Sequence, residues 1–315
     1  SRGLGDVYKR QADYFSFYAP GYKFHPKFKA KFWDGKIRLC RIDNGVMYYG
    51  LYKEIEKFAS ERDYSISFDE TFNQDSGFTY DQRELIEAKF QPRDYQIDAA
   101  SFALKNKRCV LVSPTGSGKS FIIYMIMKHL KKRTLIIVPT ISLVHQLTDD
   151  FFGYNPKTEK WIHKITAGES KETKRPIVIS TWQSIYQQPP EWFDQFEVVV
   201  GDECHLFKAS SLSTIMEKCK NIEWRIGTTG TISNADSKVH ALTLQGLFGD
   251  IKKISSTKEL MDQNYLSDFK IKVLILKYDE ETSKQIRKLK YQGEMDFLVN
   301  YEKRNNFIAN LAASQ

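Results

Sequence analysis

The feature that most limits the fold is a glycine-rich turn between a short apolar run and a helical pattern. Val110–Val112 is apolar throughout, Ser113–Ser120 reads SPTGSGKS, and a helical pattern continues over Lys119–Lys131. Such a turn exposes backbone N–H groups, and the helix that follows adds the positive end of its dipole. The arrangement predicts a strand, a phosphate-binding loop and a helix, and so an α/β protein that binds a nucleoside triphosphate.

Two side chains of this loop have specific expected tasks. Lys119 is expected to reach the transferred phosphate, and the Ser120 hydroxyl to bind Mg²⁺. The strict pattern has glycine where this chain has Ser113, and the alternative is a chance turn before a helix. The flanking strand and helix favour the phosphate loop. The loop residues expected to bind the nucleotide are Pro114, Thr115, Gly116, Ser117, Gly118, Lys119 and Ser120.

Short apolar runs alternate with helical patterns over residues 81–249. This alternation is typical of a parallel sheet covered by helices on both faces. Strands are expected at Val110–Val112, Thr134–Val138, Ile177–Ser180, Glu197–Val200 and Trp224–Gly227, with helices at Arg83–Phe90, Pro92–Asn106, Lys119–Lys131 and Ser142–Phe152. A second α/β domain is expected to begin at residue 250. Its expected elements are strands at Ile251–Ile254 and Phe269–Lys277 and helices at Thr257–Gln263 and Tyr291–Ala313.

A small basic α+β module is expected over residues 12–80. Apolar side chains recur at every second position from Tyr22 to Phe32, which predicts a half-buried strand with Phe24, Phe28 and Phe32 in the core. A hairpin turn at Asp34-Gly35 would lead to a returning strand at Ile37–Arg41. Further expected elements are strands at Val46–Tyr52 and Tyr64–Phe68, a helix at Lys53–Arg62 and a linker at Asp69–Asp81. Residues 1–11 lack an initiator methionine and are expected to be adaptor-derived, outside this fold.

The charge of the chain favours a polyanionic partner. The formal net charge is +8 and the isoelectric point is about 9.0. On the predicted strand the lysines would share one face, forming a cationic strip that binds the DNA backbone with little sequence preference. The alternative is a strand whose lysines only protect its solvent edge from aggregation. The expected DNA contacts are Lys23, Lys27, Lys29, Lys31, Lys36 and Arg38.

Two adjacent carboxylates, Asp202 and Glu203, follow the apolar run Val198–Val200. Sheets of this class place their ligands at the carboxyl ends of the strands. Asp202 is therefore expected to hold Mg²⁺ through water, and Glu203 to orient and deprotonate an attacking water. The alternative is a solvated turn, which the preceding phosphate loop disfavours.

The segment Asp202–His205 resembles the DExH box of superfamily 2 helicases, and His205 is taken as a further catalytic residue. Pro92–Gln96 resembles the segment that precedes the phosphate loop in this family. The resemblance implies that Gln96 reads the adenine edge and that Arg93 packs on the ring. It also implies a RecA-like fold that uses ATP and Mg²⁺.

Further motifs follow in the order of the family. Thr140, Gly168 and Thr181 lie in segments that resemble motifs Ia, Ib and Ic, which implies contacts with the phosphate backbone of the tracked strand. Gly227–Thr231 resembles motif III, which implies that Thr229 and Thr231 couple hydrolysis to domain movement. By itself the Thr-Thr-Gly-Thr sequence within Gly227–Thr231 is more often a turn. In the segment that resembles motif Ic, Trp182 is expected to be buried after a core strand.

The stretches Gly21–Leu39, Gln188–Phe193 and Gly201–Leu206 are similar to the UvsW helicases of T-even phages. This resemblance runs from about Phe15 to the end of the chain. It implies ATP-driven remodelling of branched DNA in recombination and repair, by fork regression, branch migration, R-loop unwinding and annealing. The alternatives are another DExH motor, such as a restriction-enzyme translocase or a nucleotide-excision-repair helicase, and a non-catalytic DNA-binding module on a motor scaffold.

Other classes of function receive less support from the sequence. The family closes ATP between two RecA-like domains, and no arginine motif of the second domain follows Phe248, so a truncated chain with weak ATP hydrolysis is expected.

No apolar run approaches the roughly 20 residues of a membrane helix. The cysteines Cys40, Cys109, Cys204 and Cys219 have no paired spacing and are expected to be mostly buried. A monomeric cytoplasmic protein is the default expectation.

Overall fold

The computed structural model of the chain describes residues 2–69, 72, 77, 81, 83, 89–207, 209–232, 238–267 and 272–314. It divides into two compact units, Ser1–Leu266 and Ser267–Gln315. The predicted linker at Asp69–Asp81 and the predicted helix at Arg83–Phe90 lie largely outside the described residues. All four cysteines are free and buried, and the prediction was that most of them would be buried.

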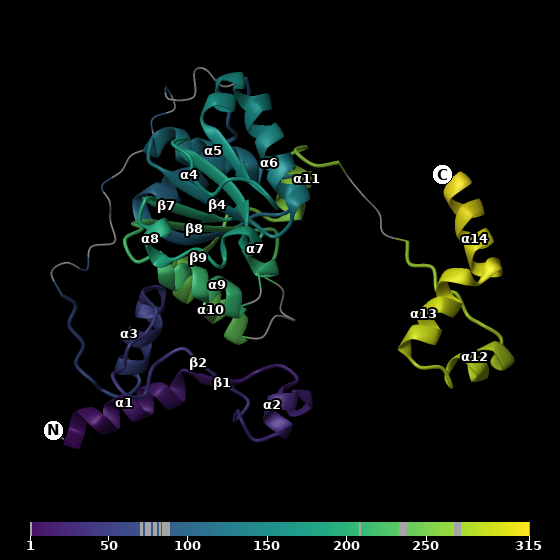
Figure 1. The fold of residues 1–315 in the computed structure, drawn as a ribbon, viewed down its shortest axis with the longest axis horizontal. Coiled ribbons are helices and arrows are strands. Elements are labelled where there is room, and N and C mark those ends of the chain that lie inside the picture. The colour runs from purple at the N-terminus through teal and green to yellow at the C-terminus, as the bar shows by residue number, and fades with distance from the viewer. Residues whose placement is uncertain are drawn as a thin grey trace. The chain divides into compact units, whose positions relative to one another are not determined.

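A seven-stranded parallel sheet forms the centre of the first unit (Figure 1). The strands follow the order β5-β6-β4-β7-β8-β3-β9, and Ile136 of β4 lies between Ile179 and Val200 of its two neighbours. The sheet confirms the predicted RecA-like α/β class. The strands are β3 (Arg108–Val112), β4 (Thr134–Val138), β5 (Ile162–Ile165), β6 (Ile177–Thr181), β7 (Val198–Gly201), β8 (Trp224–Thr229) and β9 (Asp250–Lys253).

Helices cover both faces of this sheet, as predicted. In β4, Ile136 and Val138 join one apolar core, and Leu135 and Ile137 join the core on the opposite face. Figure 1 shows α4, α5 and α6 on one side and α8, α9 and α10 on the other. Burial on both faces explains why the strands are uninterrupted apolar runs. The helices are α4 (Asp94–Asn106), α5 (Lys119–Leu130), α6 (Ile141–Tyr154), η4 (Pro156–Lys160), α7 (Trp182–Ile185), α8 (Pro190–Phe193), η5 (Cys204–Leu206), α9 (Ala209–Lys218) and α10 (Lys238–Phe248).

Strand β9 completes the sheet beside β3, and it places the end of the first unit later than predicted. Ile251 lies opposite Val110 in the parallel ladder. Gly249, with a φ of 121°, turns the chain into this strand. After β9, the Ser255 hydroxyl lies 3.2 Å from the Ser113 hydroxyl. Helix α11 (Thr257–Asp262) follows. Residues 250–266 therefore belong to the first unit, so the predicted boundary at 249 lies too early.

The predicted basic strand from Tyr22 to Phe32 is wrong. The chain there forms a 3-10 helix, η1 (Tyr22–Phe24), and a short helix, α2 (Pro26–Lys29). The His25 side chain accepts a hydrogen bond from the Lys27 backbone N–H at 3.2 Å and so caps α2. Pro26 is at the first helical position, where a missing N–H costs nothing. These two start signals outweigh the period of two in the sequence.

The remaining module differs from prediction mainly in its strands. The returning strand exists as β2 (Lys36–Arg38), but its antiparallel partner is β1 (Ser16–Tyr18), with Tyr18 opposite Lys36. The helix predicted at Lys53–Arg62 is confirmed as α3 (Tyr52–Ser60). The strand predicted at Val46–Tyr52 is wrong, because 49–51 form the 3-10 helix η2 (Tyr49–Leu51). The strand predicted at Tyr64–Phe68 is also wrong, because that segment has no regular structure.

Helix α1 (Arg2–Tyr14) belongs to this module, which corrects the exclusion of residues 1–11. The Arg10 guanidinium donates a hydrogen bond to the Tyr64 hydroxyl at 3.0 Å. Gln11 Nε2 lies 2.9 Å from Met47 Sδ. Just beyond, Ala12 is buried in the module core.

The module rests on α10 of the sheet domain. Leu242 of α10 lies in the same apolar cluster as the module core. Gly50 of η2 approaches α10 so closely that an added Cβ would overlap the Gln245 carbonyl oxygen. An ion pair between Lys53 and Asp250 adds a contact with β9. The two parts of the first unit are therefore joined by side-chain packing as well as by the chain.

The described residues of the second unit form helices and irregular segments. Its helices are α12 (Glu280–Ile286), α13 (Tyr291–Asn300) and α14 (Glu302–Ala313). The single helix predicted at Tyr291–Ala313 is divided at Tyr301. Residues 272–277 of the strand predicted at Phe269–Lys277 have no regular structure, and 269–271 lie outside the described residues.

Candidate active site

The phosphate loop lies between β3 and α5, which confirms the predicted order of strand, loop and helix. Gly116 and Gly118 have φ values of 81° and 78°, a left-handed conformation that favours glycine. Gly118 caps the N-terminus of α5, so the loop runs directly into the positive end of that helix dipole. Thr115 and Gly116 are exposed, whereas Ser117 is buried. The loop therefore presents its apex and the start of α5 to solvent, as a phosphate site requires.

Gln96 supports this loop from beneath. Its side chain is 4% exposed, and its Nε2 donates a hydrogen bond to the Ser117 carbonyl at 2.9 Å. Its Oε1 accepts from the Arg93 backbone N–H at 2.9 Å. The Tyr95 hydroxyl also donates to the Ser117 carbonyl, at 2.7 Å. Both ends of the Gln96 amide are thus engaged within the protein. Reading of the adenine edge by Gln96 stays a prediction.

Arg93 stacks on an aromatic ring that the sequence prediction missed. Its guanidinium carbon lies 4.3 Å from the centre of the Tyr265 ring. Tyr265 follows α11, so it comes from the segment that the prediction assigned to another domain. The Arg93 guanidinium also donates a hydrogen bond to the Tyr95 hydroxyl at 3.0 Å. Packing of Arg93 on the adenine ring stays a prediction.

The two predicted carboxylates follow β7 and face the loop lysine. Lys119 Nζ lies 3.2 Å from Glu203 Oε1 and donates a hydrogen bond to the Ser113 carbonyl at 3.3 Å. Asp202 is buried, and its Oδ1 accepts a hydrogen bond from the Thr228 hydroxyl at 2.6 Å. Burial raises the pKa of Asp202, and this effect exceeds the opposing effect of the Thr228 hydrogen bond. The structure thus brings Lys119, Asp202 and Glu203 together.

Glu203 has a strained backbone, with a φ of 47° in the left-handed region. Such a conformation is uncommon outside glycine and typically costs about 1–3 kcal/mol. Its Oε2 accepts a hydrogen bond from the Gly230 backbone N–H at 3.3 Å and lies 3.5 Å from His205 Nδ1. The strain therefore coincides with a carboxylate that is held in place from several sides.

His205 connects the DExH segment to the segment predicted to couple hydrolysis to movement. Its Nδ1 lies 2.6 Å from the Thr229 hydroxyl, which donates to the Thr231 carbonyl at 3.0 Å. These residues come from η5 and from the end of β8. A displacement of η5 would therefore change the position of the end of β8, and the reverse also holds.

One face of α6 closes the cleft in front of the loop. The cleft has a volume of about 350 Å³. The Tyr154 hydroxyl lies 2.7 Å from Ser120 Oγ, at the hydroxyl predicted to bind Mg²⁺. The prediction missed Asp150 and Tyr154, although the spacing of Gln146, Asp150 and Tyr154 by four residues indicates one helix face. The residues of α6 that line the cleft are Leu143, Gln146, Leu147, Asp150 and Tyr154.

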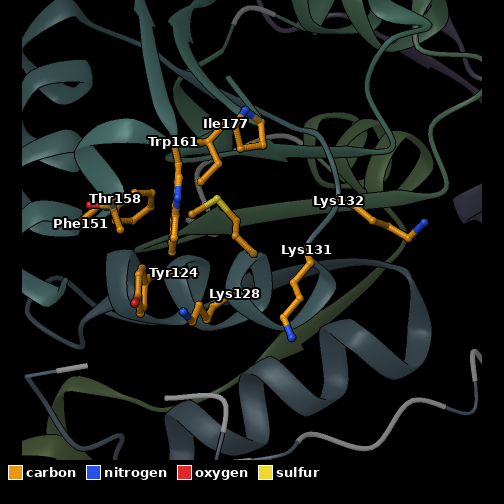
Figure 2. A pocket seen from close by; sticks show the side chains of 10 residues that line it. Tyr124, Lys128, Lys131, Lys132, Phe151, Thr158, Trp161 and Ile177 are labelled. Atoms are coloured by element: carbon orange, nitrogen blue, oxygen red, sulfur yellow. The ribbon is translucent and has the colours of Figure 1, made fainter. Parts of the chain in front are cut away.

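A separate cavity lies at the far end of α5 (Figure 2). Its volume is about 300 Å³, and Trp161, Tyr124 and Phe151 form much of its wall. Lys128 of α5 and Lys131, which follows the helix, also line it (Figure 2). It includes no residue of the phosphate loop or of the carboxylate pair. The donor set for a nucleotide and Mg²⁺ is therefore at the loop cleft and not in this cavity.

The three predicted backbone contacts of the sheet domain lie at one edge of the sheet. Thr140, Gly168 and Thr181 follow or end β4, β5 and β6, which are adjacent parallel strands. Thr140 and Gly168 are exposed. Thr181 is only 4% exposed, and its hydroxyl lies 3.0 Å from the Ser184 hydroxyl. The Thr181 hydroxyl is therefore engaged within the protein, and a contact of Thr181 with the phosphate backbone stays a prediction. The neighbouring Trp182 is half-buried against the core, which agrees with its predicted structural role.

The predicted cations of the module are on its surface, although not on one strand face. Lys23, Lys27, Lys29 and Lys31 are exposed, and Lys36 is half-buried. Arg38 differs, because its guanidinium donates to Asp34 Oδ1 at 3.2 Å. This hydrogen bond is the main cause of the lowered pKa of Asp34.

Comparison with known proteins agrees with this geometry. Residues 89–234 match the family model described as type III restriction enzyme, res subunit, and residues 4–69 match the DNA helicase UvsW N-terminal model. The crystal structure of the UvsW helicase from bacteriophage T4 is 33% identical, with a TM-score of 0.70, and the chain covers 93% of it. This chain belongs to the UvsW helicase family. A second T4 UvsW structure is 32% identical, covers 98% of the chain and has a TM-score of 0.72.

Curated relatives of this UvsW-family chain are longer than it. The ATP-dependent DNA helicase UvsW of Enterobacteria phage T4 is 34% identical over 95% of the chain. The DNA 3'-5' translocase XPB2 of Sulfurisphaera tokodaii is 30% identical over 85% of the chain. The chain spans 62% and 54% of the lengths of these two relatives.

Among the helices that the structure describes, none has the length and apolar character of a membrane span.

Proposed function

We propose that this chain binds ATP and Mg²⁺ at the phosphate-loop cleft and couples ATP hydrolysis to movement on DNA. The observation that carries the proposal is the convergence of Lys119, Ser120, Asp202 and Glu203 on one cleft. A lysine, a hydroxyl and two carboxylates are side chains that ATP hydrolysis with Mg²⁺ uses. Membership of a family whose named relative is an ATP-dependent DNA helicase supports it.

Each of these side chains has a task in the proposed reaction. Mg²⁺, when bound, would neutralise charge that develops on the phosphate oxygens. Ser120 and Asp202 would hold it. Lys119 would turn from Glu203 to the phosphates, because a phosphate oxygen competes with the carboxylate for the ammonium group.

Glu203 would then be able to accept a proton from the attacking water. The Gly230 backbone N–H holds one oxygen of this carboxylate, so the carboxylate keeps its orientation when Lys119 leaves. The link from His205 to Thr229 would pass a change at this carboxylate to the end of β8.

We further propose that the DNA substrate is branched, with fork regression, branch migration, R-loop unwinding and annealing as the resulting reactions. The match of residues 4–69 to the UvsW N-terminal model favours this substrate over that of a restriction-enzyme translocase. The exposed lysines of the module support backbone contact with little sequence preference. Thr140 and Gly168 would contact the backbone from the sheet domain.

A charge reversal on the module tests the DNA-binding part of this proposal. Changing Lys27, Lys29 and Lys31 together to Glu is expected to weaken binding of a four-way DNA junction by at least about tenfold at low salt, because phosphate contacts dominate affinity. Binding of a fluorescent ATP analogue should not change. Fluorescence anisotropy with a labelled junction gives the affinity, and an unchanged affinity at low salt contradicts the role of the module.

A further inference from the structure

Two phenylalanines of the basic module are almost fully exposed. Phe24 and Phe32 are 80% and 87% exposed. The sequence prediction placed both in the core, but the short helices η1 and α2 replace the strand that would have buried them. Single exposed apolar residues are common on protein surfaces. These two are distinctive because both lie within the stretch that carries the exposed lysines.

The Phe32 ring lines an open hollow together with cations. Lys23, Lys29 and Lys31 line the same hollow, whose volume is about 570 Å³. Trp33 forms another part of its wall. Asp34 also lines it, but its carboxylate is engaged by Arg38. The hollow therefore combines an exposed aromatic face with an excess of positive charge.

The residues beneath this hollow are fixed by packing. The Tyr22 and Phe28 rings meet edge to face, with centroids 4.9 Å apart. The Trp33 indole N–H donates a hydrogen bond to the Lys36 carbonyl at 2.9 Å. Gly35 leaves room for Tyr22, since a Cβ at that position would overlap the ring. This framework leaves Phe24 and Phe32 outside it, so their exposure follows from the local fold.

We propose that this hollow binds unpaired bases of single-stranded DNA, with Phe32 as its stacking surface, and that Phe24, which is exposed on the same module but does not line the hollow, offers a second stacking surface. Lys23, Lys29 and Lys31 would contact the adjoining phosphates. Cationic grooves with aromatic side chains bind single strands in this way, because every base has a face that stacks. The faces of bases inside a duplex are covered by their neighbours, so the hollow should prefer single-stranded segments. The inference rests on the proposed DNA-binding role of the module and adds a substrate preference to it.

The test compares aromatic and cationic variants of the full chain. Binding of a labelled 20-nucleotide dT strand and of a labelled 20-base-pair duplex is measured by anisotropy across a series of salt concentrations. The variants are Phe32→Ala, Phe24→Ala, the double variant, Phe32→Trp, and Lys23, Lys29 and Lys31 changed together to Glu. Val46→Ala serves as a matched control, because Val46 is an exposed apolar residue of the same module, 54% accessible, and lies outside the hollow. Thermal melting verifies that each variant is folded.

The proposal predicts that Phe32→Ala weakens dT binding about tenfold or more, with a smaller loss for Phe24→Ala. The slope of affinity against salt should not change, because no phosphate contact is removed. Duplex binding should hardly change, Phe32→Trp should restore dT binding, and Val46→Ala should have no effect. The lysine variant should lower both the affinity and the salt slope.

Two results would overturn the inference, and they are distinguishable. If the lysine variant weakens DNA binding while Phe32→Ala and the double variant leave dT binding unchanged, the module binds DNA without stacking, and a protein partner becomes the better occupant of the exposed rings. If neither type of variant changes DNA binding, the proposed DNA-binding role of the module fails as well.

Discussion

The phosphate-loop cleft and the N-terminal module hold their charged side chains in opposite ways. In the cleft, the Lys119 and Glu203 side chains are only 11% and 21% exposed and lie 3.2 Å apart. In the module, Lys27 and Lys29 lie on α2, a helix of four residues, and both are exposed to solvent. A chemical step needs a fixed geometry, whereas binding to a phosphate backbone tolerates mobile cations. Substitutions in the cleft should therefore affect chemistry strongly, and those on the module should affect only DNA affinity.

The largest expected effect is that of Glu203→Gln. Removing a general base typically lowers a rate by about 10²–10⁴-fold, so DNA-stimulated ATP hydrolysis should fall by that amount. Affinity for ATP should be kept or increased, because the Lys119 ammonium group loses its carboxylate partner within the protein. Single-turnover hydrolysis of radiolabelled ATP with and without DNA measures this rate.

The lysine-to-glutamate variant of the module is the control for Glu203→Gln. At saturating DNA it should hydrolyse ATP at the rate of the unmodified chain. Hydrolysis that persists in Glu203→Gln would refute the assignment of the base and remove the distinction between the two regions.

A smaller effect is expected from Gly118→Ala. The added Cβ would lie 2.5 Å from Gln96 Nε2, and the residue has a φ of 78°. We expect a loss of roughly 1–2 kcal/mol in the free energy of unfolding, since alanine is strained in the left-handed region. Urea unfolding monitored by circular dichroism measures it.

Gly153→Ala is the matched control for that substitution. Gly153 lies in α6, and an added Cβ there has no atom within 4 Å. Alanine should stabilise the helix by about 0.5–1 kcal/mol. Equal effects at Gly118 and Gly153 would contradict the strained geometry assigned to the loop.

The smallest effect is expected from Lys53→Ala, which removes the ion pair with Asp250 between the module and β9. The Lys53 side chain is 54% exposed, so the loss should be at most about 1 kcal/mol. Leu51→Ala, in the core that the module shares with α10, should cost about 2–5 kcal/mol. Urea unfolding compares them, and a larger loss for Lys53→Ala would mean that charge rather than apolar packing joins the two parts.

The sequence was most informative where function depends on a local arrangement. The phosphate loop needs only a strand, a turn and a helix in succession, so its residues could be assigned before the structure. The carboxylates after β7 could be assigned because parallel strands carry their ligands at one edge. Gln96 was harder, because its hydrogen bond to Ser117 depends on how α4 packs against α5.

The sequence misled where two local signals competed. Alternating aromatics and lysines from Tyr22 to Phe32 indicated a strand, but the cap at His25 and the proline that follows it started a helix. Among the described residues of the module, the paired strands β1 and β2 flank this segment and do not pair with it, so no sheet holds it extended. Tyr154 was missed although its spacing on α6 indicates a face with Gln146 and Asp150, because only the packed structure brings that face to Ser120. Tyr265 was missed because it contacts Arg93 from a segment far along the chain.

Binding of an ATP analogue to two lysine variants of α5 tests the central claim most directly. Lys119 faces the phosphate-loop cleft, and Lys128 lines the separate cavity of Figure 2. Titration of a fluorescent ATP analogue with Mg²⁺ should show affinity roughly 10–100-fold weaker for Lys119→Ala, because a charge-assisted contact with phosphate is lost. Lys128→Ala should bind like the unmodified chain. Unchanged affinity in Lys119→Ala, or an equal loss in Lys128→Ala, would contradict the placement of the nucleotide at the phosphate loop.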